Sequence, residues 1–221
     1  MRLSADDFVY RDDVVVVLNK PSGLAVHRGA ANDRVTALTE VRNTIGQWVY
    51  PVHRLDRGTS GLVLFVLDRH WVAPIQEQFV SNVVFKRYVA LVRGIPDERG
   101  IIDHPIPRTQ GGPRVPAKTR YELRESFERY AWLSLQPLSG RMHQLRRHLK
   151  HISHPIVGDV KYGDGRVNRE FRARFDLHRL ALHAAELRFE HPADGAIVEA
   201  RAPLPEDLRR PLTQMGLAAL T

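Results

Sequence analysis

Runs of apolar and β-branched residues predict three short strands in the first half of the chain. The first run spans residues 13–20 and ends at the polar turn 21–23, where proline and glycine stop a strand. The other two runs span residues 61–67 and 87–92. Residues 61–67 are apolar at nearly every position, which predicts a strand that is buried on both faces.

Apolar residues at helical spacing predict helices over 36–45, 71–79 and 142–151. Pro74 fits the second helix because a proline is tolerated in a first turn. In the third helix one face carries Met142, Leu145 and Leu149. The basic residues on its other faces are Arg146, Arg147 and Lys150.

Later segments predict an α+β fold. Alternation over 118–123 and 130–135 predicts two antiparallel strands joined by a turn near 125–128. A late strand is expected over 183–190 and a short edge strand over 202–204, while the Pro- and Gly-rich segment 105–116 is expected to be an exposed loop. We therefore expect one domain over residues 1–221, with a mixed, mainly antiparallel, bent sheet flanked by helices and loops.

Composition restricts the cellular compartment of the protein and excludes several kinds of functional site. The 221 residues include no cysteine, which excludes disulfides, thiolate zinc sites and cysteine nucleophiles. No apolar run has the length of a signal peptide or of a membrane helix. These features predict a protein of the cytoplasm with no membrane partner.

Charge adds a candidate class of partner. Lys and Arg number 33 against 25 Asp and Glu, and the net charge of +8 fits either a polyanion-binding protein or a merely basic one. The basic residues cluster, which favours a surface that contacts phosphates. The cluster comprises Arg141, Arg146, Arg147, His148, Lys150, His151, Lys161, Arg166, Arg169, Arg172 and Arg174.

One carboxylate lies in a glycine-flanked segment that enters the second strand. Asp56 is flanked by Arg54 and Arg57, and such neighbours keep a carboxylate ionised, as a nucleophile requires. Gly58 and Gly61 would let the backbone approach a ligand closely. Taken alone, the segment fits a turn-stabilising aspartate in surface ion pairs better than it fits a nucleophile.

The segment 53–65, HRLDRGTSGLVLF, resembles the signature of the RluA-type pseudouridine synthases. Further blocks of that family follow in the same order, from about residue 12 to about residue 203. They are NKPSGL at 19–24, FKRY at 85–88, GRMHQLR at 140–146, HPIVGD at 154–159 and LHA at 182–184. Strings of this length in a fixed order make chance agreement improbable.

The resemblance implies an isomerase and assigns roles to its residues. Asp56 would be the nucleophile, acting at C1′ of the sugar or at C6 of the base. Tyr88 would stack on the flipped uracil and could serve as a proton acceptor. Arg146 would pair with Asp56, and Arg54 would fill the space that the base leaves in the RNA. The residues expected to bind RNA are Arg54, Arg57, Arg141, His143, Arg147, Lys150 and Lys161. The reaction would need no metal and no redox cofactor.

Two other kinds of site are disfavoured. His143, His148, His151 and His154 lack the HExxH pattern, and the basic residues between them would repel a cation. Residues 20–23 lack the spaced glycines of a phosphate loop. For His53 and His143 we expect structural hydrogen bonds, because the chemistry asks for no histidine.

The substrate can be predicted only from a closer resemblance to one group of proteins within the family. Residues 140–149, 154–159 and 163–169 especially resemble the members of the family that modify tRNA, which predicts a uridine of the TΨC arm near the acceptor stem. An S4-like N-terminal domain is expected to be absent, and the chain is expected to be a monomer without an obligatory protein partner. The alternatives are a ribosomal RNA synthase of the same family, an RNA-binding protein without activity, and a metal-dependent nuclease that uses the histidines.

Overall fold

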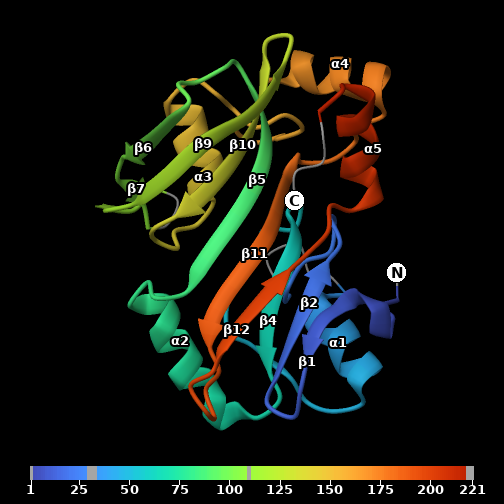
Figure 1. The fold of residues 1–221 in the computed structure, drawn as a ribbon, viewed down its shortest axis with the longest axis vertical. Helices are drawn as coiled ribbons and strands as arrows, with labels where there is room; N and C mark the ends of the chain where they lie inside the picture. Colours follow the sequence, from blue (N-terminus) through green and yellow to red (C-terminus); the bar gives the residue numbers. More distant parts are fainter. Residues whose placement is uncertain (1, 29–33, 109–110, 218–221) are drawn as a thin grey trace. The chain divides into compact units, whose positions relative to one another are not determined.

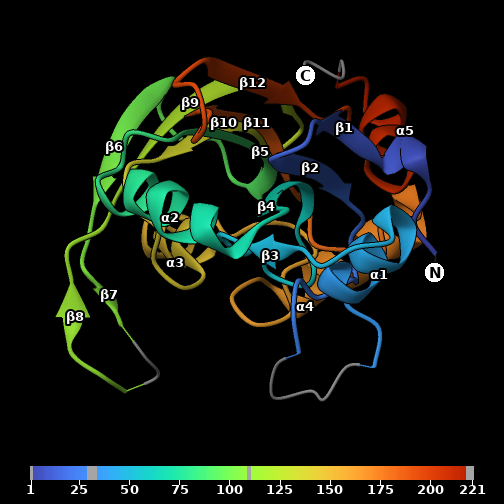
Figure 2. The same cartoon turned by 90° about the horizontal axis from the view of Figure 1, so that it is seen from below.

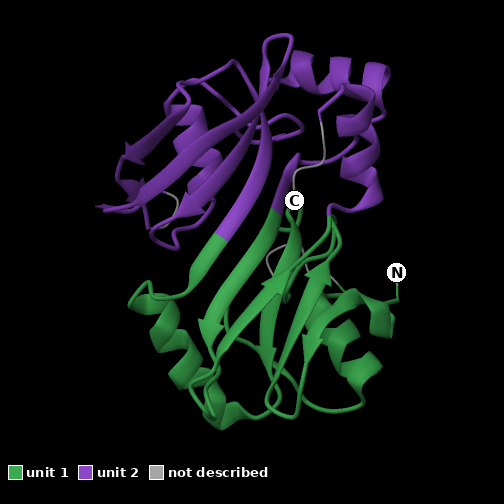
Figure 3. Cartoon of the chain, in the orientation of Figure 1, with its two compact units in different colours: residues 1–86, 184–203 green, residues 87–183, 204–221 purple. Residues whose placement is uncertain are grey.

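The structure is a computed structural model that describes residues 2–28, 34–108 and 111–217 (Figure 1). The chain forms two compact units: unit 1 holds residues 1–86 and 184–203, and unit 2 holds residues 87–183 and 204–221 (Figure 3). The boundaries fall inside two strands, β5 (Phe85–Arg93) and β11 (Leu182–Glu190). Both units combine helices with antiparallel strand pairs, so the predicted α+β class is confirmed.

Unit 1 is built on strands in the order β1-β2-β4-β11. A further strand, β3, pairs with β4, and β12 pairs with β11. The bounds are β1 (Phe8–Arg11), β2 (Val15–Lys20), β3 (Tyr50–Pro51), β4 (Ser60–Val66) and β12 (Ile197–Arg201). The strands predicted over 13–20, 61–67 and 183–190 are therefore confirmed.

The pairing of β2 with β4 places the end of one strand beside the start of the other. The two strands run antiparallel, with Val15 opposite Val66 and Lys20 opposite Gly61. All seven residues of β4 are buried, as its unbroken apolar sequence predicts. One core cluster on this pair includes Val17, Leu64 and Ile75.

Two helices of unit 1 follow the sequence signals closely. Helix α1 (Ala37–Ile45) begins after the N-cap Thr36, whose hydroxyl accepts a hydrogen bond from the Thr39 N–H, and ends at Gly46 with φ 80°. Helix α2 (Val72–Val80) follows a 3₁₀ turn, Arg69–Trp71, and holds Pro74 in its first turn. A second 3₁₀ turn, Ala5–Asp7, precedes β1.

Unit 2 contains strands in the order β5-β10-β9-β6. The bounds are β6 (Arg99–Asp103), β9 (Lys118–Phe127) and β10 (Tyr130–Pro137). The predicted pairing of β9 with β10 is confirmed, but both strands are longer than expected, and the turn falls at Glu128, whose φ is 51°. Within the segment 105–116, β7 (Ile106–Pro107) and β8 (Arg114–Val115) form a short hairpin that extends as an arm of this unit (Figure 2). Residues 109–110 of the predicted loop lie outside the described residues.

The helices of unit 2 are α3 (Gln144–His151), α4 (Gly165–Phe175) and α5 (Glu206–Gln214). Helix α3 begins two residues later than expected because His143 has φ 55°, and Met142 is 40% exposed instead of facing the core. The strand predicted over 202–204 is wrong: the edge strand is β12, and Pro203 cannot donate to a continuing ladder.

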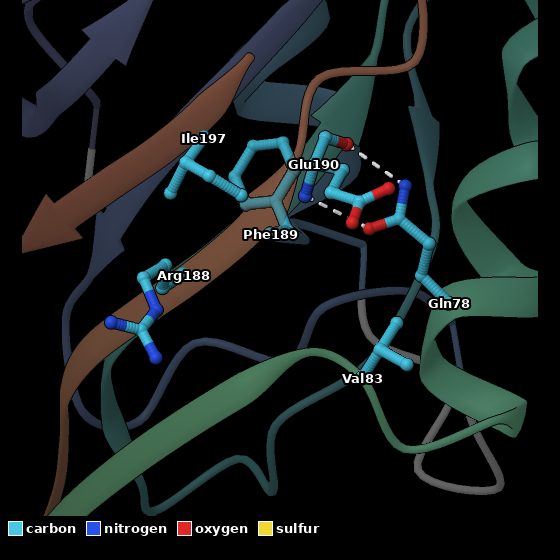
Figure 4. Close-up of a pocket in the computed structure, with 6 residues that line it drawn as sticks. All are labelled: Gln78, Val83, Arg188, Phe189, Glu190 and Ile197. Carbon is cyan, nitrogen blue, oxygen red and sulfur yellow. Dashed lines mark hydrogen bonds between the residues drawn. The ribbon is translucent and has the colours of Figure 1, made fainter. Parts of the chain in front are cut away.

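A pocket of about 240 Å³ in unit 1 contains none of the predicted site residues (Figure 4). The side-chain amide of Gln78 binds both the N–H and the carbonyl oxygen of Glu190 there, at 3.0 and 2.8 Å. In the part of the chain that the structure describes, no helix has the length and apolar character needed to cross a bilayer.

Candidate active site

Asp56 lies in the irregular segment between β3 and β4, where the sequence places the candidate nucleophile. Its side chain is half-buried, whereas Arg54 and Arg57 are exposed. The Thr59 N–H donates to the Asp56 carbonyl oxygen at 3.1 Å, which closes a turn directly before β4. This turn joins the carboxylate to a strand that is buried along its whole length.

A glycine is required at position 61 because the protein's own backbone packs closely against it. The sequence predicts instead that a ligand approaches at this position. The φ of Gly61 is 106°, and a Cβ at this position would lie 2.2 Å from the carbonyl oxygen of Ala184. The close approach expected for a ligand is therefore made by the backbone of β11. Any larger residue at position 61 would displace β4 from β11 at the end of the Asp56 segment.

Buried Lys20 supports the other side of the Asp56 segment. Its ammonium donates to the carbonyl oxygens of Pro21 and Leu24, both at 2.8 Å, and of Arg57 at 3.3 Å. The Ser22 hydroxyl donates to the Gly58 carbonyl oxygen at 2.8 Å, and the Gly23 N–H donates to that of Arg57 at 2.9 Å. The turn after β2 thus holds the two residues that follow Asp56 by their backbone.

Lys20 is a residue that the sequence reasoning missed. It is 0% exposed, and an ammonium is buried in a protein only where acceptors surround it. The available signal was a lysine at the end of an apolar strand, immediately before the Pro-Ser-Gly turn. Its inward direction agrees with the rejection of a phosphate loop over residues 20–23.

His53 fixes the start of the segment to β4 as a neutral imidazole. Its Nε2 accepts a hydrogen bond from the Leu64 N–H at 3.0 Å, and its ring stacks on Phe79 with the centroids 4.7 Å apart. Desolvation, together with the nearby positive charge of Lys86, lowers the pKa of His53 to about 3. His53 therefore makes the structural hydrogen bond that the sequence predicts for it.

In unit 2, Tyr88 and Arg146 are carried by different elements. Tyr88 is half-buried on β5, opposite Leu135 of β10. Arg146 lies in the first turn of α3 and pairs with buried Asp159, its Nε 2.7 Å from Oδ2 and its Nη2 2.8 Å from Oδ1. The ion pair predicted between Arg146 and Asp56 stays a prediction.

Backbone N–H groups, in addition to Arg146, stabilise the ionised form of Asp159. The N–H groups of Lys161 and Tyr162 donate to its Oδ1 at 2.9 and 3.0 Å. Burial alone would raise the pKa of Asp159, but the hydrogen bonds from Arg146 and from these backbone groups outweigh it and lower the pKa below its usual value. The Arg146–Asp159 pair is therefore ionised at neutral pH.

Several of the predicted RNA-binding residues gather around Tyr162, which the sequence reasoning also missed. The ring centroid lies 5.1 Å from the Arg146 guanidinium carbon, 5.8 Å from that of Arg147 and 5.6 Å from Lys161 Nζ. The hydroxyl accepts from Arg147 Nε at 3.0 Å and lies 3.0 Å from His143 Nδ1. We call Arg146, Arg147, Lys161, His143 and Tyr162 the Tyr162 cluster.

The other predicted RNA-binding residues lie outside this cluster. Arg54 and Arg57 belong to unit 1 and lie on either side of Asp56 in its segment. Lys150 is exposed on α3, and Arg141 is exposed just before that helix, where its Nε donates to the Pro116 carbonyl oxygen at 3.4 Å. On α4, Arg174 forms ion pairs with Glu128 and Glu170.

The histidines of this region make hydrogen bonds and stacking contacts. His148 lies between the Thr119 hydroxyl and the His104 carbonyl oxygen, at 2.8 and 2.9 Å, and His151 stacks on His104. Burial lowers the pKa of His148, so it is neutral at physiological pH. Among the described residues, no group of three or more histidines and carboxylates could hold a metal ion.

Comparisons with known proteins identify the family of the chain. The sequence pattern of the family described as RNA pseudouridylate synthase matches residues 14–151. The chain is 37% identical to a tRNA pseudouridine synthase C of Vibrio cholerae serotype O1, over 95% of this chain and 96% of the relative. It is 38% identical to a protein of the same name from Haemophilus ducreyi, again over 95% and 96%.

Solved structures give the same result. The human RNA Pseudouridylate Synthase Domain Containing 4 is similar with a TM-score of 0.77 and 26% identity, over 96% of this chain and 93% of that one. The human RNA Pseudouridylate Synthase Domain Containing 1 has a TM-score of 0.76 and 29% identity, over 90% and 83%. The chain therefore belongs to the RNA pseudouridylate synthases of the RluA type, isomerases that convert uridine in RNA to pseudouridine.

Proposed function

We propose that this chain isomerises one uridine of tRNA, with Asp56 as the nucleophile. The observation that carries the role of Asp56 is the double anchoring of its segment. Lys20 and Ser22 hold the backbone at Arg57 and Gly58, and His53 holds the segment to β4. A nucleophile must be kept close to its attack geometry, and rigid neighbours on both sides supply this restraint.

The reaction rearranges bonds within one nucleotide. The bond from N1 to C1′ breaks, the uracil turns, and C5 forms the new bond to C1′; the proton lost from C5 is balanced by the proton that N1 gains. Attack of Asp56 at C1′ and attack at C6 of the base both fit this balance. No atom enters or leaves, so the isomerisation itself calls for no oxidant, reductant or co-substrate.

The aromatic and basic residues have separate roles in this proposal. Tyr88 supplies a stacking face for the uracil after it leaves the RNA helix, which offsets part of the cost of unstacking. Arg54 occupies the space that the base vacates, and Arg146 stabilises the charge of the Asp56 carboxylate. Backbone phosphates are bound by the remaining basic residues, which fix the RNA without reading its sequence. These residues are Arg57, Arg141, His143, Arg147, Lys150 and Lys161.

The choice of tRNA rests on the relatives. Proteins named tRNA pseudouridine synthase C share 37–39% of their residues with this chain over most of its length. We therefore propose a uridine of the TΨC arm near the acceptor stem as the target. We also propose that residues 1–221 act as one catalytic domain and as a monomer in the cytoplasm, without a metal.

The test is an assay on unmodified tRNA transcripts in the presence of a chelator. Pseudouridine is mapped by carbodiimide treatment followed by reverse transcription, with Asp56→Asn as the control. A single stop in the TΨC arm that disappears in the variant is the expected result. A stop on ribosomal RNA alone would keep the reaction and overturn the tRNA substrate, and RNA binding without any product would favour a protein without activity.

A further inference from the structure

Asp159 is a buried carboxylate whose partners come from helix α3 and from the turn that follows it in the chain. It receives two guanidinium nitrogens of Arg146 and the N–H groups of Lys161 and Tyr162. Its side chain is 0% exposed, while that of Arg146 is 12% exposed. The predicted roles of the sequence motifs leave Asp159 without a function, although it ends one of those motifs.

The geometry of the pair restricts the arginine strongly. A guanidinium is planar, so a carboxylate bound at both Nε and Nη2 fixes the plane of the group as well as its position. The Tyr162 ring lies against the same guanidinium, with its centroid 5.1 Å away, and its backbone N–H is bound by Asp159. One carboxylate thus holds both the arginine and the ring that packs on it.

We infer that Asp159 is a positioning residue for the reaction: it fixes the orientation of Arg146 and acts on the chemistry through that arginine. The inference rests on the proposed role of Arg146. Arg146 extends from the first turn of α3 and carries several rotatable bonds, so an arginine without this partner would sample many orientations. A misplacement of about 1 Å in a group that aids the reaction can cost on the order of 100-fold in rate.

Asp159→Asn isolates the charge and the acceptor that Arg146 uses. Asparagine has nearly the same shape and keeps one oxygen for the Lys161 and Tyr162 N–H groups. Its NH₂ group is a donor, however, and cannot accept a hydrogen bond from Arg146 Nε. The variant therefore preserves the turn over 159–162 and leaves Arg146 only the bond from Nη2, without the second bond and the charge that fix its plane.

Asn168→Ala is the matched structural control. The Asn168 amide donates to the Asp159 carbonyl oxygen at 3.0 Å and accepts from the Gly158 N–H at 2.8 Å. It is buried and holds the same turn through the main chain, without contacting the Asp159 carboxylate. We expect this variant to lower the melting temperature while leaving the Arg146–Asp159 pair in place.

The experiment measures single-turnover rates at saturating tRNA for wild type, Asp159→Asn, Asn168→Ala, Arg146→Ala and the double variant Arg146→Ala/Asp159→Asn. RNA affinity and melting temperature are recorded for each protein. We expect Asp159→Asn to lose about 100-fold in rate with RNA affinity close to wild type. We expect no further loss when it is added to Arg146→Ala, because a residue that acts through another has no effect once that other is gone.

The outcomes separate the inference from the proposed function. A wild-type rate in Asp159→Asn, an additive loss in the double variant, or an equal loss in Asn168→Ala would each overturn the positioning role. A wild-type rate in Arg146→Ala would instead overturn the proposed role of Arg146 and the inference with it. If Asp159→Asn fails to fold, Asp159→Glu keeps the charge. A folded Asp159→Glu variant that retains activity supports the role, and one with the rate of Arg146→Ala contradicts it.

Discussion

The Lys20 ammonium donates a hydrogen bond to the carbonyl oxygen of Arg57, 37 residues further along the chain and next to Asp56. Lys20 is completely buried, and it also donates to the carbonyl oxygens of Pro21 and Leu24. The contact joins the end of β2 to the segment that enters β4. The placement of the proposed nucleophile therefore depends on a side chain that belongs to another strand.

Lys20→Met is expected to disturb both stability and activity. Methionine keeps the length of the side chain but removes the ammonium donor from the carbonyl oxygens of Pro21 and Leu24, and one of two donors from that of Arg57. We expect a cost of about 2–4 kcal/mol in unfolding free energy. The single-turnover rate should fall because the backbone after Asp56 is no longer held. Denaturant unfolding and a rate measurement at saturating RNA check the two effects.

Ser22→Ala provides the graded comparison for this prediction. It removes one hydrogen bond, to the Gly58 carbonyl oxygen, and should cost about 1 kcal/mol with a smaller loss of rate. A Lys20→Met protein that unfolds like wild type would show that the buried ammonium does not support the segment.

The fold could be predicted where local pattern and tertiary structure agree. The valine run of β2 and the apolar run of β4 gave correct strands because each is short and closed by turn residues. The start of α3 was missed because His143 takes a left-handed conformation that a helical pattern does not reveal. The strand predicted over 202–204 is wrong because Pro203 cannot donate to a ladder, and the segment runs on toward α5.

The site could be predicted only as a set of residue types. The sequence indicates that Asp56 lies in a turn before a strand, and the structure confirms this place. It does not indicate that Lys20 turns inward or that Asp159 receives Arg146, because both contacts depend on how distant segments pack. Long-range partners of charged residues follow from tertiary structure, which spacing along the chain does not encode.

Tyr88→Phe is expected to separate stacking from proton transfer. Phenylalanine keeps the ring on β5 opposite Leu135 and removes the hydroxyl. If that hydroxyl transfers a proton, the rate should fall by about 10²- to 10⁴-fold with unfolding close to wild type. Tyr130→Phe, on the neighbouring strand β10, is the matched control outside the predicted site. Unchanged activity in Tyr88→Phe would remove proton transfer from the role of this tyrosine.

His53 should make the stability of the protein depend on pH. Its pKa is about 3 in the folded chain against 6.5 for an ordinary histidine, so the unfolded state binds the proton more readily. Above pH 6.5, the pKa of His53 in the unfolded chain, the neutral ring contributes its full stability. This contribution is lost as the pH falls toward the pKa of about 3 in the folded chain. The loss amounts to roughly 3 kcal/mol between about pH 6.5 and pH 4.

His53→Gln isolates that contribution. The glutamine oxygen can accept from the Leu64 N–H, but the side chain does not titrate. Unfolding free energies of both proteins are measured across this pH range, and the variant should lose less stability on acidification. Parallel curves for the two proteins would assign the acid sensitivity to other groups, such as the buried His148.

Lys150→Ala is expected to weaken RNA binding and to leave the chemical step alone. Lys150 is exposed on α3, on the helix that carries Arg146 and Arg147, where an ammonium can contact a backbone phosphate. Loss of one phosphate contact should reduce the slope of log affinity against log salt by about 1, with similar losses for different RNA sequences. Lys118→Ala is the matched control, because Lys118 is exposed in the same unit but pairs with Asp103 at 2.8 Å.

A large fall in single-turnover rate at saturating RNA for Lys150→Ala would contradict the division between phosphate contacts and catalytic groups. It would place Lys150 with the residues that orient the target nucleotide.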